Sequence, residues 1–196
     1  MKKPSITACA LLSALAALAA ACAPVGNGAA PVAATALPGD ATDAERLASL
    51  LVDADAAGEG AQRDRIVATI DRIGLAALDG APDDPLARWK ASGSAGTPPM
   101  RGRALGRGYR RAKIGAGSRV ELEQLFLAGE AAEIAAAARG GTPIDFVILD
   151  KGGRTVCDTQ IAPRATCRWL PTYSARYRIR LANRSARDTS VYLVVE

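Results

Sequence analysis

Apolar and polar residues alternate along several short segments near the end of the chain. Residues 144–148 read Ile-Asp-Phe-Val-Ile, and residues 177–181 read Tyr-Arg-Ile-Arg-Leu. Because successive side chains of a strand point to opposite faces of its sheet, this alternation predicts strands with one buried face. The four residues Asp150–Gly153 lie between two such segments and are typical of a hairpin turn. Residues 118–196 are therefore predicted to form a mostly β fold, an antiparallel β-sandwich.

One segment of this region is ambiguous. Ala128–Ala138 is rich in alanine and glutamate, which have high helix propensity. A strand is favoured there because Gly129 interrupts the segment and both neighbouring segments have strand patterns. The core of the sandwich is predicted at the apolar positions Val120, Leu122, Phe126, Ile144, Phe146, Ile148, Trp169, Tyr177, Ile179, Leu181 and Val191.

Residues 41–78 have the pattern of a small helical hairpin. Thr42, with Glu45 three residues later, has the sequence of a capping box, and leucines follow at helical spacing. A second helix is predicted from Ala61 to Leu78, with an apolar stripe that ends at Ile73 and Ala77. Residues 79–117 contain four prolines and many glycines, so they are predicted to be an irregular connection with one short turn near Leu86–Lys90.

The start of the chain has the parts of a secretory signal: two lysines, an apolar stretch and then small residues. Residues 1–23 are predicted to be this signal, and residues 24–40 a flexible tether rich in Ala, Pro and Gly. Two processing routes remain open. Cleavage would follow Ala23, or Cys22 would be acylated, because Ala19–Ala21 before it resemble a lipobox. The mature chain is thus predicted to be extracytoplasmic, as a periplasmic or outer-membrane-anchored lipoprotein or as a secreted protein.

Two cysteines lie beyond the signal and Cys22. Cys157 and Cys167 form an even pair in a chain predicted to be exported, where disulfides persist. A disulfide between them is predicted, and two reduced, buried thiols are the alternative.

The sequence contains no histidine. It therefore lacks the side chain most often used for proton transfer near neutral pH, which excludes hydrolytic triads and histidine-ligated zinc in their usual forms. Asp145, Asp150 and Asp158 lie around one predicted hairpin, where carboxylates near a glycine turn suit calcium. Turn and surface roles are favoured for these carboxylates. We predict a protein that is not an enzyme and holds neither cofactor nor metal; a histidine-free hydrolase is the weakest alternative.

Charge is distributed unevenly along the chain. Residues 40–64 carry seven acidic and two basic side chains, whereas residues 101–119 carry seven basic and no acidic ones. This asymmetry predicts surfaces of opposite sign that face each other or different partners. Arg110 and Arg111 of the basic stretch are candidate anion-binding residues. A solvated linker, or contact with the acidic helices, is the alternative.

A second group of arginines lies within residues 159–187, a segment without acidic residues. Arg176, Arg178 and Arg180 project from one face of a predicted strand. Like charges on one strand face repel, so a sheet tolerates them mainly where the face is wet or covered by an anion. These three arginines are the main candidate anion-binding face. An edge strand protected by charge against aggregation is the alternative.

Four stretches of the sequence together resemble the bacterial pre-peptidase C-terminal domain. They are Phe126–Glu130, Pro143–Gly153, Trp169–Pro171 and Tyr177–Asn183. The resemblance covers about residues 109–196. It implies an exported β-sandwich that is usually non-catalytic, takes part in secretion, adhesion or surface binding, and is sometimes stabilised by calcium.

These observations together predict a non-catalytic binding or scaffolding module of the cell envelope. Its arginine-rich surface would face an anionic polymer, lipid or protein; nucleic acid is not an expected partner, and membrane contact is expected through acylated Cys22. The alternative is a structural or secretion-linked appendage that docks a protein partner through the acidic hairpin 41–78.

Overall fold

The computed structural model describes residues 41–93, 107–140 and 143–196, and every structural statement below concerns this part of the chain. The predicted signal 1–23, the tether 24–40 and Cys22 lie outside it. The described helices are α1 (Asp43–Ala56), α2 (Ala61–Ile73) and α3 (Pro85–Ser92). The described strands are β1 (Ala76–Ala77), β2 (Gly108–Ile114), β3 (Arg119–Phe126), β4 (Ala132–Ala138), β5 (Ile144–Leu149), β6 (Thr155–Ile161), β7 (Arg164–Trp169), β8 (Ala175–Asn183) and β9 (Thr189–Val195).

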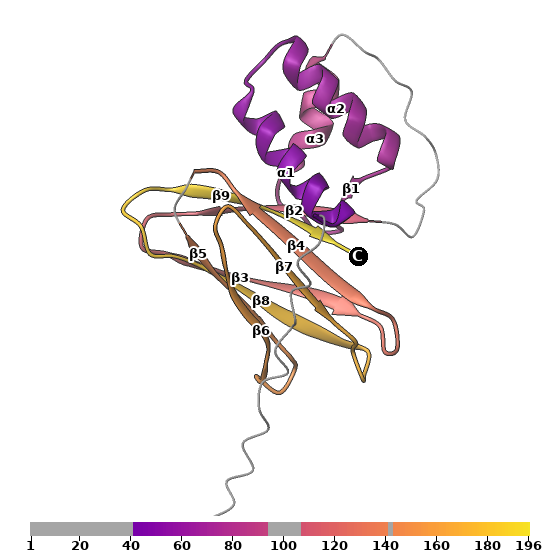
Figure 1. Ribbon diagram of the computed structural model, residues 1–196, viewed down its shortest axis with the longest axis vertical. Helices are drawn as coiled ribbons and strands as arrows, with labels where there is room; N and C mark the ends of the chain where they lie inside the picture. The colour runs from indigo at the N-terminus through magenta and orange to yellow at the C-terminus, as the bar shows by residue number, and fades with distance from the viewer. Residues whose placement is uncertain (1–40, 94–106, 141–142) are drawn as a thin grey trace, which may run out of the picture. The chain divides into compact units, whose positions relative to one another are not determined.

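The strands form two sheets that pack face to face (Figure 1). One has the order β1-β2-β9-β4-β7 and the other the order β3-β8-β5-β6. All neighbouring strands are antiparallel except β1 and β2, which are parallel. The prediction of a mostly β fold with an antiparallel sandwich is confirmed.

The two sheets enclose a core of aliphatic and aromatic side chains. Ile144, Phe146 and Ile148 of β5 are fully buried, because they occupy alternate positions on the face that meets the other sheet. Phe126 packs edge-on against Trp169, with ring centroids 4.7 Å apart, and thereby closes one end of this core. All the predicted core positions lie in this cluster or pack against it.

The ambiguous alanine-rich segment is a strand. The structure places β4 at Ala132–Ala138, between β9 and β7, after a turn in which Gly129 has a φ of 77°. Almost every residue of β4 is buried, because Ala136 faces the other sheet while Ala135 and Ala137 face the helices. Small side chains let α1 approach the sheet closely, and this packing on both faces outweighs the helix propensity of alanine.

The helices cover the outer face of the five-stranded sheet, as Figure 1 shows. Thr42 and Glu45 form the predicted capping box, with the Glu45 backbone amide 3.1 Å from Thr42 Oγ1. Leu47 and Leu51, one turn apart on α1, pack with Tyr192 and Val194 of β9 in a second hydrophobic core. The hairpin therefore shares a core with the sandwich.

The second helix is shorter than predicted. It ends at Ile73, because Gly74 adopts a left-handed conformation with a φ of 80° and caps the helix. Ile73 is 45% exposed, so the buried stripe consists of Val67 and Ile70 instead. The chain then forms β1 in place of the last predicted helical turn.

The predicted irregular connection 79–117 contains two regular elements, which corrects that prediction. The helix α3 begins at Pro85, capped by the Asp84 side chain, and extends the expected short turn to eight residues. The strand β2 pairs along its whole length with β9. Gly108 is required in β2, since a Cβ there would lie 2.1 Å from the Leu78 side chain. The sheet thus starts before residue 118. The sequence did not predict β2 because the glycines and arginines of this stretch are typical of an irregular connection.

Candidate anion-binding surfaces

The three predicted arginines of β8 lie on the outer face of the four-stranded sheet. Arg176, Arg178 and Arg180 alternate with the buried Tyr177 and Ile179, as the period-two pattern requires. The strand lies between β3 and β5, so the alternative of a charge-protected edge strand is wrong. Their charge must be balanced within the sheet, by solvent or by a ligand.

Carboxylates on β3 balance part of the positive charge of the β8 arginines. Glu121 pairs in register with Arg180, whose Nε donates to its Oε1 at 2.8 Å, and the hydrogen bond lowers the pKa of the Glu121 carboxyl. Glu123 is the cross-strand neighbour of Arg178, and Leu125 that of Arg176. Arg176 and Arg178 make no ion pair within the described residues, and Arg176 is exposed.

The side chains of Arg110 and Arg111 both make contacts with other parts of the chain. Arg111 contacts Asp55 Oδ2 at 3.4 Å and Asp83 Oδ2 at 3.2 Å, and its side chain is 14% exposed. Its guanidinium also lies over the Tyr192 ring, 5.7 Å from the centroid. Arg110 donates to the backbone oxygen of Gly80 at 3.0 Å. Arg111 therefore joins the helical layer to the sheet.

The same contacts explain the uneven charge of the chain. Arg107 pairs with Asp43 of α1 and with Glu196, and Arg111 pairs with Asp55 near the end of α1. The basic strand β2 thus faces the acidic helix, as one of the two predicted arrangements required. The paired charges of Arg107 and Arg111 are therefore compensated within the fold.

The carboxylates around the β5–β6 hairpin have structural roles. Asp150 Oδ1 accepts from the backbone amides of Gly152 and Arg154 at 2.8 and 2.9 Å, which closes the turn and lowers the pKa of the carboxyl against the opposing effect of its burial. Asp145 accepts from Arg184 Nε at 2.5 Å and Gln160 Nε2 at 3.1 Å, and its pKa is also lowered. Within the described ranges no three cysteine or carboxylate side chains gather as a metal site would require.

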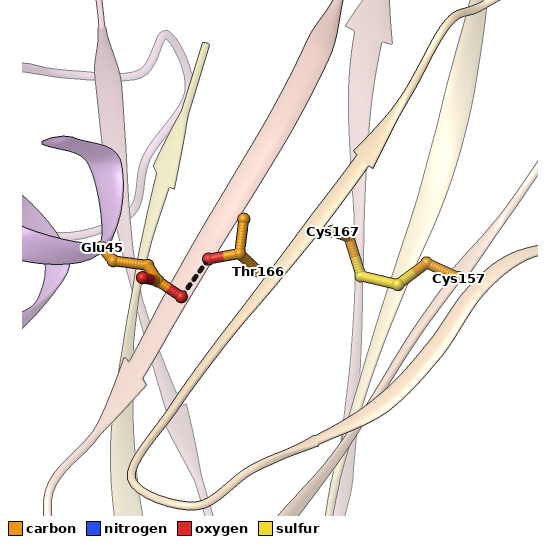
Figure 2. Close-up of a disulfide and its surroundings, with 4 residues drawn as sticks. All are labelled: Glu45, Cys157, Thr166 and Cys167. Atoms are coloured by element: carbon orange, nitrogen blue, oxygen red, sulfur yellow. Dashed lines mark hydrogen bonds between the residues drawn. A yellow bond between two sulfur atoms is a disulfide. The ribbon is translucent and has the colours of Figure 1, made fainter. Parts of the chain in front are cut away.

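The predicted disulfide is confirmed. Cys157 of β6 and Cys167 of β7 are bonded, with their Cα atoms 6.1 Å apart. The two strands are edge strands of different sheets, so the bond links the layers of the sandwich. Figure 2 shows the neighbouring side chains Thr166 and Cys167 on opposite sides of β7. Thr166 Oγ1 donates to Glu45 of α1 at 2.6 Å, so β7 is held from both faces.

Two buried tyrosines also tie the helices to the sheet. The Tyr109 hydroxyl donates to Asp84 Oδ1 at 2.5 Å and accepts from the Leu86 amide at 3.0 Å, at the start of α3. Burial, followed by the hydrogen bond to Asp84, raises the pKa of Tyr109. Burial and the negative charge of Asp55 raise the pKa of Tyr192 as well.

A basic pocket of about 550 Å³ lies where the β2–β3 turn, the β8–β9 turn and the end of β4 meet. Its lining includes Lys113, Arg139 and Arg187, none of which was among the predicted site residues. Lys113 and Arg187 lie in the two basic stretches of the sequence, but Arg139 stands at the end of an alanine-rich strand without such a signal. The pairing of β9 with both β2 and β4 brings the three together.

None of the described helices is long and apolar enough to cross a membrane. No protein-family model matches the sequence, and no curated protein matches it significantly.

Several solved structures are similar to part of this chain. A periplasmic inhibitor of g-type lysozyme from Aeromonas hydrophila has 13% identity and a TM-score of 0.37, covering 46% of this chain and 84% of its own. The pre-peptidase C-terminal domain of a Bacillus anthracis collagenase has 12% identity and a TM-score of 0.39, covering 46% and 89%. The mitogen of Yersinia pseudotuberculosis has 11% identity and a TM-score of 0.35, covering 46% and 84%.

Proposed function

We propose that this protein is an extracytoplasmic, non-catalytic binding module whose β8 arginine face binds an anionic polymer of the cell envelope. The β8 arginine face is the row Arg176, Arg178 and Arg180. The observation that carries the proposal is that Arg176 and Arg178 point outward from the middle of a sheet without an ion pair in the described part of the chain. The like charges of these arginines repel each other, and an external anion bound to them would remove this repulsion.

The geometry of the face suits an extended ligand. Alternate residues on one strand are about 7 Å apart, so the face presents charges in a straight row. Guanidinium groups bind carboxylate, sulfate and phosphate oxygens with two parallel hydrogen bonds. Glu121 and Glu123 are the cross-strand neighbours of Arg180 and Arg178, whereas the neighbour of Arg176 is Leu125. The positive charge of Arg176 is therefore the least compensated of the three.

Location and lack of catalysis rest on composition and on the disulfide. The chain has no histidine, and its described carboxylates around the β5–β6 hairpin serve turns and surface pairs. A disulfide linking the two sheets is the kind of bond that persists in oxidising compartments. Both points agree with the signal sequence expected at residues 1–23.

The test is retention of the mature protein on heparin-agarose under a salt gradient. The double variant Arg176→Ser/Arg178→Ser should elute at clearly lower salt than the wild type, because the exposed charge of Arg176 and the half-buried charge of Arg178 are gone. The matched control is Arg65→Ser/Arg72→Ser on α2, which removes the same charge from exposed positions of another surface. Equal elution of the two double variants would refute the proposal.

The competing possibility, a protein partner on the acidic hairpin, predicts a different result. Deleting residues 41–78 would be a poor test of it, because α1 covers the core shared with β4 and β9. Neutralising the exposed Asp53 and Glu59 leaves that core intact. Loss of one co-purifying protein in Asp53→Asn/Glu59→Gln, with unchanged heparin retention, would favour the hairpin over the β8 arginine face.

A further inference from the structure

The lining of the basic pocket includes none of the three arginines of the β8 arginine face. It is formed by the end of β2, the turn after it, the end of β4 and the β8–β9 turn, with Asp55 of α1 at its edge. Its volume, about 550 Å³, is in the range of pockets that hold small molecules.

The walls of the pocket are fixed by hydrogen bonds between the turns. Asn183, only 1% exposed, donates through Nδ2 to the backbone oxygens of Gly115 at 3.1 Å and Arg187 at 2.7 Å. Asp188 Oδ1 accepts from the Ala116 amide at 2.9 Å, which ties the same two turns a second time. A site whose walls are already in place loses little conformational entropy when a ligand binds.

The end of β4, which forms the third wall of the pocket, is also held by hydrogen bonds. The Arg139 amide donates to Ser190 O at 3.2 Å, and Thr189 Oγ1 donates to Arg139 O at 3.1 Å. Arg139 therefore has a fixed backbone, while its exposed side chain is free to reach the pocket.

Positive charge is in excess in the pocket. Its described lining has four cationic side chains, Arg111, Lys113, Arg139 and Arg187, against the two carboxylates Asp55 and Asp188. Arg111 already forms an ion pair with Asp55. Lys113 Nζ lies 4.0 Å from Asp83 Oδ2, at the outer limit of an ion pair. Arg139 and Arg187 make no ion pair with any described residue, so they remain available to an anion.

The rest of the lining consists of Ile114, two glycines and three residues with hydroxyl groups. Ser185, Thr189 and Ser190 add three hydroxyl groups. Those of Ser185 and Thr189 already donate to Asn183 Oδ1 and Arg139 O, so their oxygens offer a ligand acceptors rather than donors. None of the described lining residues is aromatic. Neutral sugars are usually held by stacking on an aromatic side chain, which the described lining does not offer. A small anion carrying several hydroxyl groups fits both the charge and the hydrogen-bonding groups. We propose that the pocket binds a phosphorylated sugar, with Arg139 and Arg187 on the phosphate and the hydroxyl side chains on the sugar.

The experiment is isothermal titration of the mature protein at low salt with glucose 6-phosphate, inorganic phosphate and glucose. Glucose 6-phosphate should bind more tightly than either of the other two. In Arg139→Ser/Arg187→Ser its affinity should fall by about tenfold or more, since charge-assisted hydrogen bonds are lost. Both side chains are exposed, so equal melting temperatures of variant and wild type will exclude a folding defect.

Two control variants separate this site from other arginines. Arg65→Ser/Arg72→Ser removes two exposed charges on α2 and should leave the affinity unchanged. Arg176→Ser/Arg178→Ser should do the same, so that failure of the β8 arginine face and failure of the pocket are distinguishable. Absence of binding, equal affinity for inorganic phosphate and glucose 6-phosphate, or an equal loss in a control variant would each overturn the proposal.

Discussion

The side chain of Asn183 offers the sharpest test of how this fold is held together. It is the one buried polar residue among the described positions, and it accepts from the Ser185 amide at 3.0 Å and the Ser185 hydroxyl at 2.7 Å in addition to the bonds that it donates. Asn183→Ala removes four good hydrogen bonds, after which Gly115 O and Arg187 O keep only their second donors, the Ser118 amide and the Ser185 hydroxyl.

The expected loss of stability follows from these bonds. Each contributes about 0.5–1.5 kcal/mol net, and water can reach part of the exposed turns, so we expect the free energy of unfolding to fall by about 2–3 kcal/mol. For a cooperative unit of this size, that loss lowers the melting temperature by about 6–9 °C. Thermal and urea unfolding followed by far-UV circular dichroism would measure both quantities.

The adjacent exposed Arg184 provides the control. Its ion pair with Asp145 lies on the surface, with an 82% exposed arginine side chain, and exposed pairs contribute about 1 kcal/mol or less. Arg184→Ser should therefore melt close to the wild type. If Asn183→Ala melted within about 2 °C of the wild type as well, the hydrogen bonds of Asn183 would not hold the two turns together, and the reasoning would fail.

Three further predictions concern the links between layers. Cys157→Ser should lower the free energy of unfolding by about 2–3 kcal/mol under oxidising conditions, from the entropy of a loop of about ten residues, and the difference should vanish under reductant. Folding raises the pKa values of Tyr109 and Tyr192 above the unfolded value of about 10. Their contribution to the free energy of unfolding is therefore complete below about pH 10 and is lost as the pH rises above it. Urea unfolding should therefore show stability falling by up to about 1.4 kcal/mol per pH unit for each tyrosine, and a flat profile would contradict this. Arg111→Met should cost about 2–3 kcal/mol, because Asp55 and Asp83 would lose their shared partner at half-buried positions; a loss below 0.5 kcal/mol in chemical denaturation would argue against that role.

Features that depend on local geometry could be predicted from the sequence. The alternation in β5 and β8, the Asp150 hairpin turn and the Thr42 capping box follow from backbone periodicity and from bonds within a few residues. The cysteine pair was predictable for a related reason, since only two cysteines lie beyond the predicted signal and Cys22, enough for one bond. In each case the interacting groups, or the only available partners, can be read from the sequence without knowledge of the fold.

Tertiary structure decided the features that depend on which distant segments meet. The alanines of β4 form a strand because a sheet and a helix pack on its two faces, a context that outweighs their intrinsic preference. Arg111 belongs to a basic stretch of sequence, yet it lies between two carboxylates from distant segments and is withdrawn from the surface. The basic pocket depends on strand order, because β2, β4 and β9 bring three cations together from positions far apart in the chain. Periodicity along a chain determines which face of an element is apolar, but the pairing of elements determines which charges neutralise each other and which remain free to bind.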